Sequence, residues 1–185
     1  LRVDTDGLAG RAPLDVASGT TLQDVVGPLD YGFRTYTLLP ESRPVATGSP
    51  AARAVPVPSS AELTVGSLNL QRFFDAEDDG EGTTLTPTAF SARLAKAALA
   101  IRTFLRTPDV LAVVEVEDLA TLRALAARIS ADALAAGAPD PAYQSFLEEG
   151  NDPGGIDVGF LVASRVSVLS VVQEGKGATF VDPTT

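Results

Sequence analysis

The most informative stretch of this chain is Pro108-Asp-Val-Leu-Ala-Val-Val-Glu-Val-Glu-Asp118. Its near-continuous apolar run over residues 110–116 predicts a strand buried on both faces of a sheet. Glu115 interrupts that run, and a carboxylate in such a place is costly to bury unless it is paired, protonated or bound to a metal ion. For Glu115, the residues alone leave metal binding and an ion pair with a neighbouring arginine equally open.

A second stretch, Ser67-Leu-Asn-Leu-Gln-Arg-Phe-Phe-Asp75, repeats this pattern earlier in the chain. Asn69 breaks a strand that is predicted over residues 63–70. In α/β sheets the ends of strands are where ligands and metal ions are held. We therefore expect Asn69 and Glu115 to lie on adjacent strands, with their side chains converging on one site.

Two helices are predicted around the second of these strands. Thr86-Pro87 supplies an N-cap and a first-turn proline, and Asp118 can cap a second helix that Gly137 ends. Each helix has an apolar stripe at helical spacing. The stripes are Phe90, Leu94, Ala98, Ile101 and Leu105 in the first helix, and Leu119, Leu122, Ala126, Ile129 and Ala133 in the second.

Further strands are expected at residues 143–147, 156–162 and 166–172, the last two as a hairpin. The alternation of strands and helices predicts an α/β domain over residues 61–185. Residues 1–40 carry short β-like runs separated by Gly, Pro and Asp, at 13–17, 22–26 and 33–39, with turns near 27–28 and 31–32. Residues 41–60 are rich in Pro, Ala and Ser and are expected to be a linker.

Composition narrows the classes of function. With 45% hydrophobic and 21% charged residues, this chain of 185 residues should fold. No apolar stretch approaches the ~20 residues of a membrane helix, so no membrane partner is expected. The formal net charge of −10 opposes nonspecific attraction to nucleic acid backbones. Because the chain has neither Cys nor His, the expected metals are those that prefer oxygen ligands, Mg²⁺ or Mn²⁺ and also Ca²⁺.

Three segments, in order, resemble the endonuclease/exonuclease/phosphatase superfamily: Ser67 to Phe74, Pro108 to Glu117, and Gly155-Ile-Asp-Val-Gly-Phe-Leu161. The resemblance implies that Asn69 and Glu115 are catalytic and hold Mg²⁺ or Mn²⁺ during phosphodiester hydrolysis, with Glu117 next to the metal ligands. It implies a structural role for Asp157. The implied fold is a partial four-layer α/β/β/α sandwich with an N-terminal β segment.

The resemblance covers residues 62–172, which is the first half of such a domain. Residues 21–40 also resemble the end of the OB-like domain that precedes the nuclease domain in large bacterial extracellular nucleases, which implies DNA as substrate and a secreted protein. The chain lacks a signal peptide and any Met, so it is expected to be a fragment or processed product, inactive by itself. A non-catalytic binding or interaction module derived from that fold is the alternative, and a homodimer through an exposed sheet edge at residues 156–172 is expected.

Two other features have simpler interpretations. The acidic run Asp75 to Gly80 has the spacing of a calcium loop, but Thr86 stands where the bidentate Glu would be, which favours a solvated loop. Arg93 lies on the first helix and is expected to contact a phosphate, Glu115 or neither.

Overall fold

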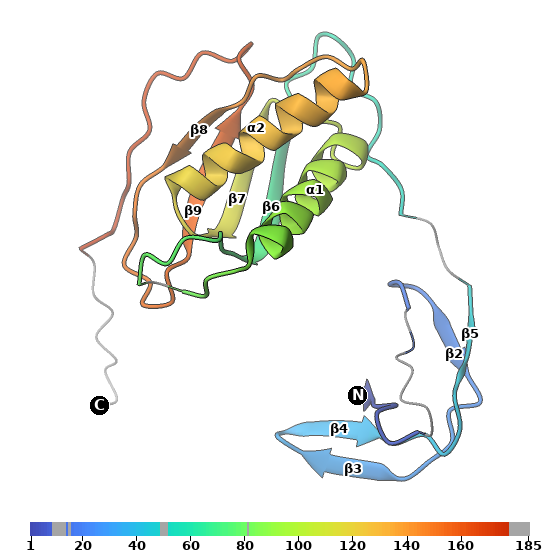
Figure 1. Ribbon diagram of the computed structural model, residues 1–185. Coiled ribbons are helices and arrows are strands. Elements are labelled where there is room, and N and C mark those ends of the chain that lie inside the picture. Colours follow the sequence, from blue (N-terminus) through green and yellow to red (C-terminus); the bar gives the residue numbers. More distant parts are fainter. Residues whose placement is uncertain (9–13, 15, 49–51, 81, 178–185) are drawn as a thin grey trace. The chain divides into compact units, whose positions relative to one another are not determined.

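The computed structural model describes residues 1–8, 14, 16–48, 52–80 and 82–177. The chain divides into two compact units, residues 1–52 and 53–185 (Figure 1). The first unit consists of short strands in two small sheets. One sheet has β4 (Thr35–Leu38) between β1 (Arg2–Val3) and β3 (Leu29–Gly32), and the other pairs β2 (Thr21–Gln23) with β5 (Val45–Thr47).

The first unit differs from the expected pattern in two places. The strand expected over residues 33–39 begins only at Thr35, because Phe33 and Arg34, with φ of 50° and 64°, form the turn next to residues 31–32. β5 lies inside the stretch 41–60 that was expected as a linker, because antiparallel pairing with β2 satisfies its backbone. The strand predicted at residues 13–17 includes residues outside the described part.

The second unit is α/β. Along the chain it contains β6 (Val65–Phe73), α1 (Pro87–Thr103), β7 (Val110–Val116), α2 (Leu119–Ala135), β8 (Gln144–Leu147) and β9 (Asp157–Val162). The sheet order is β6-β7-β9-β8, with β6 parallel to β7 and the other two pairs antiparallel. Both helices pack on the same face of this sheet (Figure 1). No helix in the described part of the chain has the length and apolarity to span a membrane.

The predicted helix signals are confirmed. The Thr86 hydroxyl accepts a hydrogen bond of 3.2 Å from the Ala89 N–H at the start of α1. Asp118 accepts one of 2.7 Å from the Thr121 N–H at the start of α2. The predicted stripes face the sheet, and the apolar core between sheet and helices includes Ile101, Leu111, Leu122, Ile129 and Leu161.

The hairpin predicted for residues 156–162 and 166–172 is wrong. β9 is an interior strand, paired with β7 on one side and with β8 on the other, so its hydrogen-bonding groups are already taken. Residues 166–172 form no strand. Instead, Val171 and Val172 line a small pocket with side chains of β8 and β9. The exposed edge that was expected at residues 156–172 therefore lies elsewhere, because the edge strands of this sheet are β6 and β8.

The sheet face opposite the helices is largely apolar. Paired residues lie on the same face of a sheet, and the register places Val114 with Val158 and Ala112 with Phe160 on this one. Val65, Val158 and Phe160 are exposed to 72%, 61% and 40%. Residues 171–173 line a pocket with Val158 and Phe160 on part of this face. No helix of the described residues covers it, whereas both helices cover the opposite face.

Candidate metal-binding site

Asn69 and Glu115 meet near the ends of two neighbouring strands. Asn69 is on β6 and Glu115 on the parallel strand β7. The Asn69 side chain donates a hydrogen bond of 2.7 Å from Nδ2 to Oε1 of Glu115. The expectation that these side chains converge from adjacent strands is confirmed.

A β-bulge turns Glu115 towards Asn69. Asn69 pairs with Val114, so regular alternation would place the Glu115 side chain on the opposite face, beneath the helices. Glu115 has φ of 62°, and the pairing with β9 shifts there, from Val114–Val158 to Val116–Asp157. Because a bulge re-aims the side chain of the extra residue, Glu115 can reach Asn69 on the neighbouring strand.

β6 carries a matching irregularity. Its pairing with β7 jumps from Asn69–Val114 to Phe73–Val116, and Gln71 and Arg72 between them have φ of 58° and 53°. The Gln71 N–H donates to Oδ1 of Asn69 at 2.6 Å. The Arg72 N–H donates to Oε2 of Glu115 at 3.0 Å. The left-handed backbone costs a non-glycine residue about 1–2 kcal/mol, so three such residues together hold this site in a strained but hydrogen-bonded geometry.

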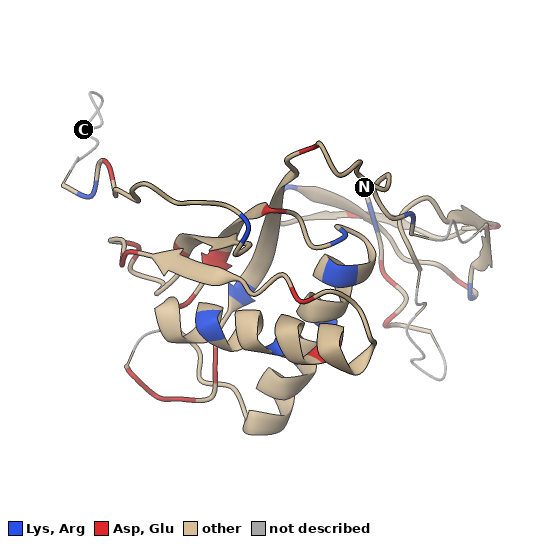
Figure 2. Cartoon of the chain, turned by 90° about the horizontal axis from the view of Figure 1, so that it is seen from above, with Lys and Arg blue, Asp and Glu red and all other residues tan. Residues whose placement is uncertain are grey.

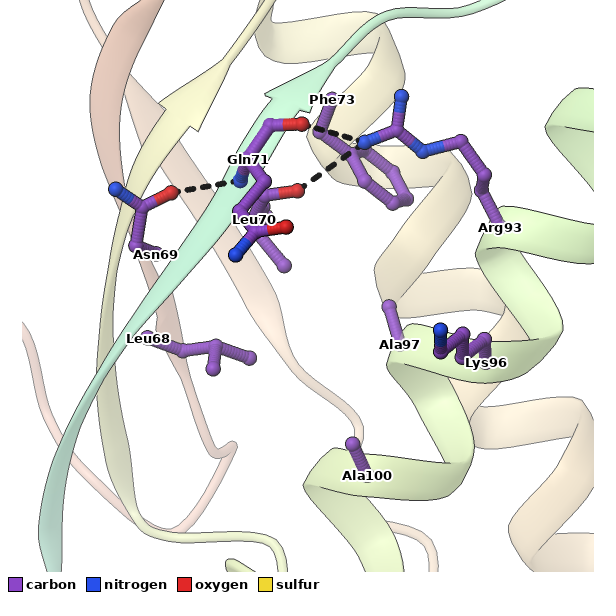
Figure 3. Close-up of a pocket in the computed structure, with 9 residues that line it drawn as sticks. All are labelled: Leu68, Asn69, Leu70, Gln71, Phe73, Arg93, Lys96, Ala97 and Ala100. Carbon is purple, nitrogen blue, oxygen red and sulfur yellow. Dashed lines mark hydrogen bonds between the residues drawn. The ribbon is translucent and has the colours of Figure 1, made fainter. Parts of the chain in front are cut away.

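Arg93 contacts backbone rather than Glu115. Its guanidinium donates to the carbonyl oxygens of residues 70–72 in β6. Together with Lys96 of α1 and the end of β6, it lines an open pocket of about 270 Å³ (Figure 3). Of the expected alternatives, the contact with Glu115 is not among these hydrogen bonds, and a contact with phosphate stays a prediction.

A second acidic group lies at the ends of the same two strands. Carboxylate oxygens of Asp75, Glu117 and Asp118 lie within 4.8 Å of one another, so this cluster could hold a metal ion. Burial raises the pKa of the Glu117 carboxyl, the N–H of Asp75 opposes that effect at 2.7 Å, and the charges of Asp75, Asp79 and Asp118 raise the pKa further. A divalent cation would relieve this repulsion.

The three residues were not expected together. Asp118 was expected only as the cap of α2, and Asp75 as part of a solvated loop. The sequence did contain a signal: Asp75 ends the stretch 67–75 and Asp118 ends the stretch 108–118. The strands in these stretches are adjacent and parallel, so both residues lie at the same end of the sheet. The expected position of Glu117 beside Asn69 and Glu115 is different in the structure, because Glu117 is buried and faces Asp75 and Thr121 instead.

Acidic residues also surround the neighbouring open pocket of about 460 Å³, which Glu117, Asp118, Asp152 and Asp157 help to line. Asp157 accepts a hydrogen bond of 2.7 Å from the Gly150 N–H, as a structural residue would. Figure 2 shows acidic positions gathered on the loops at this end and basic positions on the helices. Acidic side chains at this end attract a cation, which would also reduce the repulsion of a phosphate backbone.

Comparisons with protein-family models, with curated proteins and with solved structures found no match for this chain.

Proposed function

We propose that Asn69 and Glu115 belong to the metal site of a phosphodiester hydrolase that acts on DNA. One observation carries the proposal: the three left-handed, non-glycine residues Gln71, Arg72 and Glu115 lie at this pair. Such strain persists only where the surrounding structure enforces it, and it is frequent at functional sites. Turns elsewhere in the described chain, such as Phe33–Arg34, have it too, but only here does it hold two polar side chains from adjacent strands together. The Glu115 carboxylate does not form the ion pair with arginine that was the alternative. Its oxygens accept hydrogen bonds from the Asn69 side chain and from the Arg72 N–H.

The side chains present suit Mg²⁺ or Mn²⁺, and Ca²⁺ as a further candidate. Asn69 and Glu115 offer an amide and a carboxylate oxygen, and Mg²⁺ is usually held by one or two carboxylates together with waters and substrate phosphates. A bound ion of this kind polarises a phosphoryl oxygen and lowers the pKa of bound water. In this chain, Asn69 and the Arg72 N–H fix the orientation of the Glu115 carboxylate.

The proposal extends to the fold and the setting. In a four-layer α/β/β/α sandwich, a second sheet would pack on the open face that carries Val65, Val158 and Phe160, as facing sheets do. The short strands of the first unit would correspond to the end of an OB-like domain, and the setting would be extracellular. Exposed apolar surface on one face of the sheet supports this arrangement.

We expect the purified chain to cleave no plasmid DNA in the presence of Mg²⁺ or Mn²⁺. It contains no histidine, and two ligands without a water-orienting acid and a group that stabilises the phosphate do not complete a hydrolytic site. A gel assay for nicking of supercoiled plasmid measures this. Metal-dependent cleavage that disappears in Glu115→Gln would contradict the expectation.

Metal binding tests the proposal directly. We expect Mn²⁺ to broaden the NMR signals of the Gln71 and Arg72 amides, and Glu115→Gln to weaken that effect. Glu117→Gln is the matched control, since it makes the same change in the neighbouring acidic cluster. If Glu117→Gln abolishes the effect and Glu115→Gln does not, the ion occupies the cluster and the proposed assignment of Glu115 is wrong.

A non-catalytic interaction module is the second candidate function. The observation that favours it is the open apolar face of the sheet, in a chain without histidine. Under this alternative, Mn²⁺ at millimolar concentration leaves the signals of Gln71 and Arg72 unchanged, while substitutions on the open face alter association.

A further inference from the structure

Arg93 holds the backbone at the point where β6 leaves its regular course. Its Nη1 donates to the carbonyl oxygen of Arg72 at 2.8 Å. Its Nη2 donates to the carbonyl oxygens of Gln71 at 2.6 Å and Leu70 at 3.3 Å (Figure 3). One guanidinium thus binds three consecutive carbonyl groups, and the two left-handed residues are among them.

The guanidinium is itself held in place. Its Cζ lies 5.2 Å from the centre of the Phe73 ring, within the range of a cation–π contact. Phe73 is buried in the core, and Arg93 projects from α1, whose Ala98 and Ile101 are buried. The planar fork of arginine donates in several fixed directions, whereas the lysine ammonium acts as a compact point charge on a flexible stem.

Peptide geometry links this contact to the candidate site. In a trans peptide the C=O of one residue and the N–H of the next point in opposite directions, and the described chain has no cis peptide. The Leu70 carbonyl faces Arg93, so the Gln71 N–H points away from it, to Asn69. The Gln71 carbonyl also faces Arg93, so the Arg72 N–H points to Glu115. Figure 3 shows Asn69 and Arg93 on opposite sides of β6.

We infer that Arg93 is a positioning residue: by binding the carbonyl groups of residues 70–72, it fixes the two N–H groups that orient Asn69 and Glu115 for a divalent cation. The inference rests on the proposed function, because it assigns Arg93 a role in that same site. Arg93 touches neither Asn69 nor Glu115 in the hydrogen bonds described, and it acts through the backbone between them.

Arg93→Lys tests this inference, since it keeps the charge and the helix propensity but loses the fork. In the metal-free chain, we expect the Gln71 and Arg72 amides to exchange with solvent at least about tenfold faster, as the loss of one hydrogen bond implies. We also expect the NMR signals of the Asn69 side-chain amide to shift, and the affinity for Mn²⁺ to fall about tenfold or more. Arg93→Ala should give larger effects of the same kind.

Arg102→Lys is the matched control. Arg102 lies on the same helix, and its contact with Asp132 at 4.0 Å is remote in sequence from residues 70–72. We expect it to leave amide exchange and Mn²⁺ affinity unchanged.

The outcomes separate the inference from the proposed function. Unchanged exchange of Gln71 and Arg72 in a folded Arg93→Lys chain would overturn the role of Arg93, whatever the metal does. If the Gln71 and Arg72 amides exchange faster in Arg93→Lys but the wild-type chain binds no Mn²⁺, then the proposed metal site is wrong. Arg93 then stabilises only the backbone of β6. Faster exchange with weaker Mn²⁺ binding supports both.

Discussion

At the scale of single residues, Asp109 is a buried carboxylate with several hydrogen-bond partners. It is 4% exposed and accepts hydrogen bonds of 2.7 Å from both the N–H and the hydroxyl of Thr64. It also pairs with the Arg165 guanidinium. Burial by itself would raise the pKa of Asp109, but the hydrogen bonds from Arg165 and Thr64 outweigh that effect and lower it from 3.8 to about 2. Asp109 thereby joins the start of β7 to the segments before β6 and after β9.

Asp109→Asn should lower the free energy of unfolding at pH 7 by about 2–3 kcal/mol, because hydrogen bonds to a charged group are lost. The folded-state pKa lies below the ordinary value of 3.8, so the contribution is present above pH 3.8 and is lost as the pH falls through about 2. The difference between variant and wild type should therefore shrink on acidification. Urea unfolding followed by circular dichroism, at several pH values, measures it.

Asp132→Asn is the control for this prediction. Asp132 pairs with Arg128 at 2.8 Å, but both side chains are partly exposed, at 33% for Arg128 and 25% for Asp132. Such pairs contribute about 0–1 kcal/mol. Equal losses in the two variants would contradict the special role of Asp109.

Glu117→Gln should raise the unfolding temperature of the chain measured in EDTA. The substitution removes one charge from a buried position that Asp75, Asp79 and Asp118 crowd, and it keeps an acceptor for the Asp75 N–H. The same variant should gain less stability than wild type when Ca²⁺ is added, because a ligand stabilises only the state that binds it. Differential scanning calorimetry measures both effects. Glu174→Gln, at an exposed position, should change neither.

At the scale of elements, the sequence predicted those helices and strands that have regular apolar spacing or clear capping residues. Apolar spacing and caps such as Thr86 and Asp118 gave both helices, and the continuous run at residues 110–116 gave β7. The bulge at Glu115 could not be predicted, because its left-handed backbone depends on contacts between strands far apart in sequence. Asn69 and Glu115 were expected together because each follows an apolar run at the end of a predicted strand. The contact of Arg93 with the β6 backbone was not expected, because it too depends on the folded course of β6.

Gln71→Gly tests the strain in β6. The left-handed backbone costs a non-glycine residue about 1–2 kcal/mol, and glycine returns about 0.5–1 kcal/mol of that through its greater freedom when unfolded. We expect a net gain in stability of about 0.5–1 kcal/mol, with weaker Mn²⁺ binding because the turn loosens.

Gln144→Gly is the control, since Gln144 is exposed in the regular strand β8. There the same change should destabilise by about 0.5–1 kcal/mol. Urea unfolding of both variants shows whether each substitution raises or lowers the free energy of unfolding. A loss of stability in Gln71→Gly as large as that in Gln144→Gly would mean that position 71 is unstrained.

At the scale of the whole molecule, the two units differ in how they are stabilised. Among the described residues, the apolar core lies within the second unit. In the first unit, Tyr31, Phe33 and Tyr36 are exposed, with the two tyrosine rings 4.6 Å apart. The second unit buries one face of its sheet and leaves apolar side chains on the other, with β6 and β8 as edges. Both features favour association with another surface.

We therefore expect the chain to self-associate at micromolar concentration through the open face of its sheet. The double substitution Val158→Lys with Phe160→Lys should shift the chain to a monomer, because both side chains lie on that face and are exposed. Lysine there would place charge in the contact, which is costly to bury.

Sedimentation velocity over a range of concentrations measures this association. Leu169→Lys is the control, since Leu169 is 98% exposed but belongs to no strand of the sheet, so it should leave association unchanged. If the wild-type chain is a monomer at every concentration and unfolds in one sharp transition, then the open face needs no partner. The proposal of a second sheet packed on Val158 and Phe160 would then lose its main support.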